Sequence, residues 1–188
     1  MVRHLRARPA RHLTPSEFQD RFREALDATR HIFRKVEALQ YYDESGDPSW
    51  EAFRRGDHAT AMAELDCIVD EQTELLKPAL TRGVSLTRLR IVEYPVTDYV
   101  RWEFASYELS RKIGEQIFAI EKTALEGQLP DFVSFDDDIL VLLEYSAEGK
   151  FCQGIEYRAC REVEDLIAAY DETVARAVPA ERFPLNAP

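Results

Sequence analysis

One segment near the middle of the chain changes its hydrophobic period, and this change limits the folds that the chain can adopt. From Leu86 the apolar residues recur at a spacing of two, which predicts a strand. Tyr94 and Pro95 end that strand, because proline cannot donate to a ladder and the residue before it avoids helical geometry. Thr97 is a favourable N-cap and predicts a helix over about 97–112. The chain must therefore combine helices with a sheet.

Two helical regions are predicted before this strand. Apolar residues recur at intervals of three and four after Pro15, which predicts a first helix over about 15–41. The segment YYDESGDPS predicts a loop, since glycine and proline among polar residues interrupt regular structure. Asp57 is the predicted N-cap of a second helix. Pro78 and Gly83 end this helix.

Further strands are predicted in the carboxyl-terminal half. They are Gln116–Lys122 and the segments FVSF, ILVLLEY and FCQGIEY. The acidic tripeptide Asp136–Asp138 has the composition of a hairpin turn between two of them. An amphipathic helix is predicted over about 160–177. The fold class that follows is α+β, with a mixed or antiparallel sheet of four to five strands covered by helices in the order α-α-β-α-β-β-β-α.

The chain is predicted to hold one domain. In this interpretation residues 1–13 form a flexible basic arm, residues 14–178 the single α+β domain, and residues 179–188 an irregular tail. The net charge is −11, although the first twelve residues hold four arginines and no acid. Because so acidic a body repels phosphate backbones, nucleic-acid binding is expected only through the basic arm.

The sequence predicts a cytoplasmic protein with no membrane partner. Its longest apolar run, Ile139–Leu143, is far shorter than the ~20 residues of a membrane-spanning helix. The basic amino terminus leads into no apolar signal region. Three cysteines without paired spacing, Cys67, Cys152 and Cys160, indicate reduced thiols.

Several kinds of chemistry lack their sequence signatures. The chain has no glycine-rich phosphate or dinucleotide motif, and none of the motifs G-x-S-x-G, H-E-x-x-H and H-x-K. Its histidines, His4, His12, His31 and His58, have no metal-ligand spacing with each other or with cysteine. Neither a cofactor nor a metal ion is therefore expected.

The densest group of polar residues surrounds the switch from strand to helix. Arg88 and Arg90 share one face of the predicted strand, next to a helix N-terminus that also suits oxyanions. The predicted ligand-binding residues are Arg88, Arg90, Thr97, Asp98, Tyr99 and Arg101. A small carboxylate or phosphate ligand fits this set. In the alternative interpretation the arginines only neutralise Asp98, Glu103 and nearby acids.

The acidic hairpin offers a different kind of site. Asp136–Asp138 could hold a hard cation or divide acid and base roles, but a solvated turn has the same composition. A small enzyme acting on a phosphate- or carboxylate-bearing substrate would use Asp136, Asp137 or Glu144 as acid or base.

An aromatic group lies in and after the first predicted loop. It consists of Tyr41, Tyr42, Trp50 and Phe53. Such residues can line a ligand site or cap the core beneath a long loop.

Three ordered motifs resemble an actinobacterial family of domains of unknown function. They are RLRIVEYPVTDYVRWE at 88–103, GEQI at 114–117 and DFVSFDDDILVLLEY at 131–145, followed by Gly149. The carboxyl-terminal half is also similar, more faintly, to effector-like domains fused to actinobacterial helix-turn-helix regulators. Members of the resembled family are often encoded beside such regulators, so the resemblance implies a regulatory role and supplies no catalytic residues.

The function expected from these features is that of a non-enzymatic regulatory or partner-binding module. It would sense a small anionic metabolite and act with a helix-turn-helix transcription regulator. The alternative is the small enzyme with acid and base carboxylates.

Overall fold

The strand predicted from the period of two lies inside a mixed sheet. The computed structural model describes the backbone of residues 2–186 and their side chains except those of residues 2, 66 and 68–72. Eight strands of this described chain join one sheet in the order β1-β7-β6-β5-β2-β3-β4-β8. The strands are β1 (Arg11–Leu13), β2 (Ile32–Glu37), β3 (Ser85–Val92), β4 (Gln116–Glu121), β5 (Phe132–Phe135), β6 (Ile139–Tyr145), β7 (Phe151–Arg158) and β8 (Val178–Pro179). The helices are α1 (Val2–Leu5), α2 (Pro15–Ala28), α3 (Pro48–Arg54), α4 (His58–Thr81), α5 (Asp98–Lys112) and α6 (Arg161–Arg176), with 3-10 turns η1 (Lys122–Ala124) and η2 (Ala180–Arg182).

Two kinds of connection build the sheet. β2, β3 and β4 are parallel, and helices cross between them: α3 and α4 lead from β2 to β3, and α5 leads from β3 to β4. β5, β6 and β7 follow as an antiparallel meander, with β5 beside β2. The carboxyl ends of β2 and β3 therefore lie together, and open sheets with parallel strands commonly bind ligands there.

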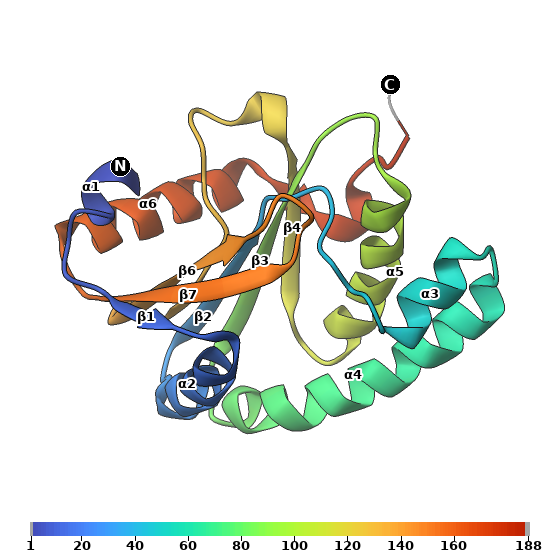
Figure 1. Ribbon diagram of the computed structural model, residues 1–188, viewed down its shortest axis with the longest axis horizontal. Helices are drawn as coiled ribbons and strands as arrows, with labels where there is room; N and C mark the ends of the chain where they lie inside the picture. Colours follow the sequence, from blue (N-terminus) through green and yellow to red (C-terminus); the bar gives the residue numbers. More distant parts are fainter. Residues whose placement is uncertain (1, 187–188) are drawn as a thin grey trace.

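Helices cover both faces of the sheet (Figure 1). α1 and α6 lie against one face, where Leu166 and Tyr170 belong to the same buried cluster as Leu89 of β3. α2, α3, α4 and α5 cover the other face. Because side chains alternate along a strand, Arg88 and Arg90 point to the α5 face. Within residues 2–186, no helix combines the length and the apolar content that crossing a bilayer requires.

Side-chain caps fix where three of the helices begin. Thr14 forms a capping box with Glu17, because each side chain accepts a hydrogen bond from the backbone N–H of the other. Asp57 and Thr97 cap α4 and α5, each accepting from the N–H three residues further on. The predicted starts of these helices are confirmed.

The strands and the helix predicted in the carboxyl-terminal half are confirmed as well. β4, β5, β6, β7 and α6 lie within two residues of their predicted positions. Asp136–Asp138 form the turn that joins β5 to β6.

The prediction of four to five strands is wrong, because the sheet has eight. The strands that the sequence pattern did not indicate are β1, β2 and β8. The observed order is α-β-α-β-α-α-β-α-β-β-β-β-α-β in place of α-α-β-α-β-β-β-α. β1 and β8 hold three and two residues, which is too short for a period to be visible.

β2 replaces the second half of the predicted first helix. α2 ends at Ala28, and Thr29 turns into extended geometry while its hydroxyl donates to the Ala25 carbonyl. Phe33 packs on the α2 face of the sheet and Val36 on the α6 face. A strand that is buried on both faces carries apolar residues on both, and their combined spacing imitates that of a helix.

Both ends of the described chain pack on the sheet. α1 buries Leu5 in the cluster beneath α6, and β1 buries Leu13 while it pairs with β7. At the other end β8 pairs with β4, and Ala180 of η2 is buried. The segments predicted as arm and tail therefore contribute strands, and the predicted domain boundaries stay a prediction.

Candidate functional site

Arg88 is held between the two strands that flank β3. Its Nε and Nη2 atoms donate to the two carboxylate oxygens of Glu115, at 2.9 and 3.1 Å. Its Nη1 atom donates to Oε1 of Glu37 at 3.0 Å. Burial opposes the charge of this guanidinium, but the two carboxylates outweigh burial and raise the pKa of Arg88. Arg88 therefore bridges the end of β2 and the residue before β4.

Arg90 is fully buried further along the same strand. Its Nη1 atom donates to the backbone carbonyls of Glu37, at 3.0 Å, and of Leu39. Its Nη2 atom lies 2.7 Å from Oε2 of Glu103 on α5. The guanidinium also lies 5.8 Å from the centre of the Tyr42 ring. Both arginines are thus paired with acids inside the protein, which is the arrangement of the alternative interpretation.

These contacts form a charge lattice, which consists of Arg88, Arg90, Glu37, Glu103 and Glu115. Its two central acids differ in protonation. Burial raises the pKa of Glu37, but Arg88, Lys35 and Arg90 outweigh burial and hold this pKa well below its ordinary range. At Glu103 burial outweighs the attraction of Arg90 and raises the pKa to about 8. Glu37 is therefore ionised at neutral pH, whereas burial favours the protonated form of Glu103.

A cavity of about 210 Å³, the acidic chamber, opens beside the charge lattice at the carboxyl end of β2. Among the described residues, four acids and one cation line it: Glu37, Asp43, Glu44, Glu103 and Lys35. The tyrosines of its wall are Tyr42, Tyr99 and Tyr145. The chamber is thus rich in carboxylates and phenol groups.

Burial also controls protonation in the wall of the acidic chamber. It raises the pKa of Glu44, although the Tyr99 hydroxyl donates to Oε1 of this residue at 3.1 Å. Burial raises the pKa of Tyr42, Tyr99 and Tyr145 above the ordinary value as well. The phenol groups therefore stay neutral at physiological pH, and those of Tyr42 and Tyr99 donate hydrogen bonds to Asp131 and Glu44.

A second cavity, the apolar chamber, has a volume of about 260 Å³. Its walls come from α2, α4 and the sheet, and include Phe18, Phe22, Leu75, Leu86, Val133 and Leu143. Lys35, Tyr145 and Phe151 line both chambers, so the two cavities adjoin. Together they form a site with an apolar end and an acidic end.

The predicted ligand-binding residues are spread over several places. Arg88 and Arg90 belong to the charge lattice, and Arg88 also lines the apolar chamber. Tyr99 lines the acidic chamber. Thr97 caps α5 and donates from its hydroxyl to a carbonyl of the loop after β2, at 3.0 Å. Asp98 is exposed in the first turn of α5.

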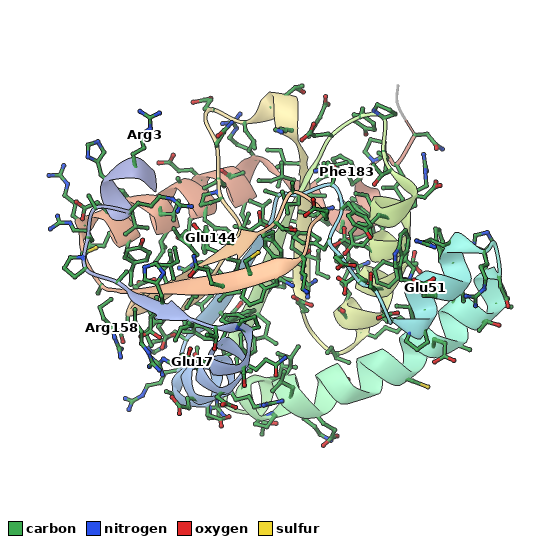
Figure 2. All side chains as sticks on the ribbon, viewed as in Figure 1. Arg3, Glu17, Glu51, Glu144, Arg158 and Phe183 are labelled. Carbon is green, nitrogen blue, oxygen red and sulfur yellow. The ribbon has the colours of Figure 1, made fainter. Side chains whose placement is uncertain are left out.

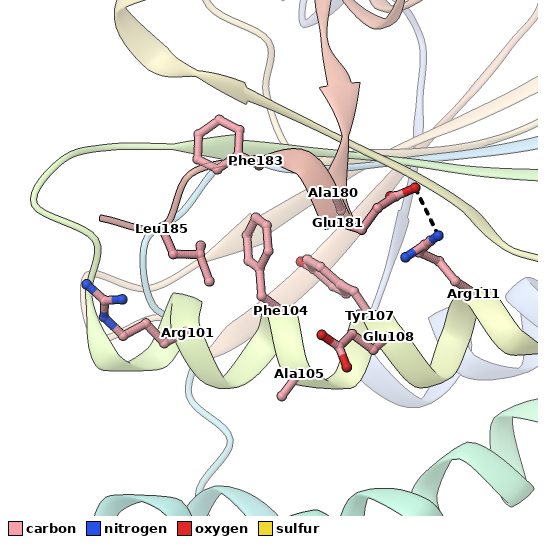
Figure 3. Close-up of a pocket in the computed structure, with 10 residues that line it drawn as sticks. All are labelled: Arg101, Phe104, Ala105, Tyr107, Glu108, Arg111, Ala180, Glu181, Phe183 and Leu185. Carbon is pink, nitrogen blue, oxygen red and sulfur yellow. Dashed lines mark ion pairs between the residues drawn. The ribbon is translucent and has the colours of Figure 1, made fainter. Parts of the chain in front are cut away.

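Arg101, the sixth predicted residue, lines a different cavity (Figure 3). This third cavity of about 230 Å³ lies between α5 and the carboxyl-terminal segment, and shares no lining residue with either chamber. Phe104 and Phe183 form part of its wall, and Arg111 pairs with Glu181 across it at 3.0 Å. The structure therefore does not bring Arg101 together with the other arginines.

The acids proposed for an enzyme lie apart from both chambers. Glu144 projects from β6 and pairs with Arg6, while Gln153 donates to its other oxygen at 2.7 Å (Figure 2). Asp137 is 72% exposed at the hairpin turn, where it pairs with Arg34. Such exposure and separation count against a pair of acid and base groups.

Asp136 stabilises the backbone at the amino end of β2. Its carboxylate accepts from the N–H groups of Arg30, His31 and Ile32, at 3.0, 2.8 and 2.9 Å. These hydrogen bonds outweigh burial and lower the pKa of Asp136. Its φ of 48° is in the left-handed region, which aspartate tolerates better than most residues.

Asp136→Ala is therefore expected to lower the free energy of unfolding by about 2–3 kcal/mol, because three N–H groups lose a charged acceptor. Asp136→Asn should lose about 1 kcal/mol, since it keeps one acceptor oxygen and tolerates the backbone geometry. Urea denaturation measures both changes. Asp138→Ala, at an exposed position of the same turn, is the matched control; equal losses at 136 and 138 would contradict the assigned role.

Sequence reasoning missed several residues of the chambers. Lys35 and Glu37 are not predicted as site residues, because the predicted helix over about 15–41 includes the residues of β2. Glu115 and Tyr145 stand at strand boundaries, where a single residue gives no periodic signal. The signal that could have indicated these residues is the spacing of two between Phe33, Lys35 and Glu37, which places all three on one face of a strand.

A family model described as a domain of unknown function, DUF6879, matches residues 20–184 of the chain. The chain belongs to the DUF6879 family. This outcome confirms the resemblance to a family of such domains, whereas the actinobacterial source and the neighbouring regulator genes stay predictions. Among curated proteins no match was found for this DUF6879 chain.

Two solved structures are similar to this DUF6879 protein at low sequence identity. One is Nuc, a phospholipase D family member from Salmonella typhimurium, with a TM-score of 0.54 and 9% identity over 91% of this chain and 97% of that chain. Another is TrmBL2, an archaeal chromatin protein described with a novel mode of DNA binding, with a TM-score of 0.49 and 11% identity. The match covers 92% of this chain and 55% of TrmBL2. The likeness to Nuc concerns the fold, and this chain has no H-x-K motif.

Proposed function

We propose that this chain is a non-enzymatic binding module of regulatory type, which takes one small amphipathic molecule into the two adjoining chambers. The apolar part of the ligand would occupy the apolar chamber and its polar end the acidic chamber. The observation that carries the proposal is the shared wall of Lys35, Tyr145 and Phe151, which joins an aromatic pocket to a carboxylate-rich one.

The position of the chambers supports this proposal. The acidic chamber lies at the carboxyl end of β2, where the loop after this strand supplies Tyr42, Asp43 and Glu44. Loops there can adjust to a ligand while the sheet stays rigid. A ligand could in this way change the surface that a partner protein recognises.

The partner and the compartment remain part of the proposal. The proposal that the partner is a helix-turn-helix regulator rests on the sequence resemblance. Action in the cytoplasm is consistent with free thiols at Cys67, Cys152 and Cys160. An anionic metabolite at Arg88 and Arg90 stays a prediction from the sequence, because both guanidinium groups contact carboxylates.

Leu75→Trp tests the apolar chamber. Leu75 is 37% exposed at the rim of this chamber, so a larger ring there should fill the cavity and leave the fold intact. We expect 1-octanol to bind the wild type at a single saturable site and to bind the variant about tenfold more weakly. Isothermal titration calorimetry measures the affinity.

Met62→Trp is the matched control, since Met62 lies on the same helix, is 39% exposed and lines neither chamber. Its affinity for 1-octanol should equal that of the wild type. If 1-octanol does not saturate a site on the wild type, or if both variants bind like the wild type, the proposed function is wrong.

A further inference from the structure

We infer that the polar end of the ligand is an uncharged oxygen, as in an alcohol, a ketone or an ester, and that the hydroxyl group of Tyr145 donates a hydrogen bond to it. This inference rests on the proposed function, since it names the chemical class of the head group for the same site. It differs from the anion that the sequence predicts at Arg88 and Arg90.

The hydroxyl group of Tyr145 is available to a ligand. The Tyr145 ring lines both chambers and packs against Tyr42 and Phe151, with ring centres 4.9 and 5.6 Å away. Its hydroxyl forms no hydrogen bond with any described residue, and the half-buried side chain leaves this oxygen accessible. The hydroxyl groups of Tyr42 and Tyr99, in contrast, already donate to carboxylates. Among the described phenols of the acidic chamber, Tyr145 therefore supplies the free donor.

A β-bulge in β7 places Phe151 beside Tyr145 in the shared wall. The pairing of β6 with β7 shifts at Tyr145, which pairs with Phe151 and leaves Cys152 as an extra residue. Because side chains alternate along a strand, a regular β7 would place Phe151 and Gly154 on opposite faces. Both nevertheless lie against Phe18 of α2: the two phenylalanine ring centres are 5.1 Å apart, and a Cβ added at Gly154 would lie 3.1 Å from the Phe18 ring. Bulges commonly redirect side chains next to functional sites.

The charged groups at the junction of the chambers pair with one another. Nζ of Lys35 lies 2.6 Å from Oε1 of Glu37. Arg88 donates to Glu37 at 3.0 Å and to both oxygens of Glu115, at 2.9 and 3.1 Å. Two cations thus meet two carboxylates. A charged head group would have to break one of these pairs or lose its own hydration without a counterion, and a neutral oxygen avoids both costs.

The other acids of the acidic chamber have partners as well. Glu44 accepts a hydrogen bond from the Tyr99 hydroxyl, and Asp43 accepts from the N–H and the hydroxyl of Ser45. Glu103 belongs to the charge lattice. Burial raises the pKa of Glu44 and of Glu103, which favours their uncharged forms. This wall therefore offers hydrogen-bonding groups to a neutral ligand.

The test compares four ligands by isothermal titration calorimetry at pH 7. Three of them, 1-octanol, octanoate and octylammonium, share one alkyl chain and differ in charge. The fourth, toluene, is apolar and has no oxygen. The variant Tyr145→Phe removes the hydroxyl group and keeps the ring. Tyr157→Phe is the matched control, because Tyr157 lies on β7 and lines neither chamber.

For the wild type we expect 1-octanol to bind at least about tenfold more tightly than octanoate or octylammonium. Tyr145→Phe should bind 1-octanol about fivefold more weakly, which corresponds to the loss of one hydrogen bond between neutral groups. Its affinity for toluene should equal that of the wild type, since toluene needs only the apolar chamber. Tyr157→Phe should bind both compounds as the wild type does.

The results that would overturn the inference are distinct from those that would overturn the proposed function. Suppose that 1-octanol binds and that Leu75→Trp weakens it, so that the proposed function stands. The inference is then wrong if Tyr145→Phe keeps its affinity for 1-octanol, if it loses toluene to the same extent, or if Tyr157→Phe has an equal effect. It is also wrong if either ion binds as tightly as 1-octanol. If 1-octanol saturates no site on the wild type, the inference and the proposed function both fail.

Discussion

Arg90→Met is expected to lower the free energy of unfolding by about 3–5 kcal/mol, because buried acceptors lose their donor and the buried, ionised Glu37 loses a neighbouring cation. Arg90 is fully buried, and it donates to the carbonyls of Glu37 and Leu39 besides contacting Glu103. Methionine fills much of the same space but supplies no donor. Urea denaturation of both proteins at neutral pH measures the difference.

Arg101→Met is the control for this substitution. Arg101 makes a hydrogen bond with Asn186 near the surface and belongs to no buried ion pair among the described residues. Its loss should change the unfolding free energy by about 0.5 kcal/mol or less. The double variant Arg90→Met and Glu103→Leu should recover part of the loss, since it also removes the buried carboxyl group that has lost its contact with Arg90. A loss below about 1 kcal/mol for Arg90→Met would show that the charge lattice contributes little to stability.

The second large effect is a dependence of stability on pH that Glu103→Gln removes. The pKa of Glu103 is about 8 in the folded protein, against an ordinary value of 4.5. Between these values the folded carboxyl holds a proton that the unfolded chain has lost. The contribution of Glu103 to stability therefore falls as the pH rises through this window, by up to about 1.4 kcal/mol per pH unit.

Glu37 acts in a different window, so the two acids can be separated. Its pKa is lowered in the folded protein, and its contribution is complete above the ordinary pKa of 4.5 and lost as the pH falls below it. Between pH 5 and pH 8 the difference between Glu103→Gln and wild type thus reports Glu103.

Denaturation curves at pH 5, 6, 7 and 8 provide the measurement. The stability of Glu103→Gln relative to the wild type should increase steadily from pH 5 to pH 8, by a few kcal/mol in total. Glu108→Gln, on the same helix, should keep a constant difference from the wild type. A constant difference for Glu103→Gln as well would mean that Glu103 is ionised throughout this range.

The sequence predicts those parts of the fold that depend on local signals. The unit of β3 and α5 follows from a change of period at Pro95 and from the cap at Thr97, both of which act over a few residues. The hairpin at Asp136–Asp138 is equally local. These elements are present because neighbouring residues suffice to specify them.

Long-range contacts explain why the number of strands and the site were not predicted. β2 is recognised as a strand from its partners β3 and β5, which are 48 and more residues away in the chain and invisible to a local pattern. The same distance hides the charge lattice: Arg88 was visible, but its partners Glu37 and Glu115 are 51 and 27 residues away. Without them, an anion site and an ion-pair lattice look alike.

The two shortest strands protect the sheet from other chains. β1 covers the edge of β7, and β8, which ends in a proline, covers part of the edge of β4. Short edge strands and proline are the means by which proteins prevent edge-to-edge association. A chain trimmed to residues 20–184, the span of the family match, would lose β1 and leave the backbone of β7 open as a template for aggregation.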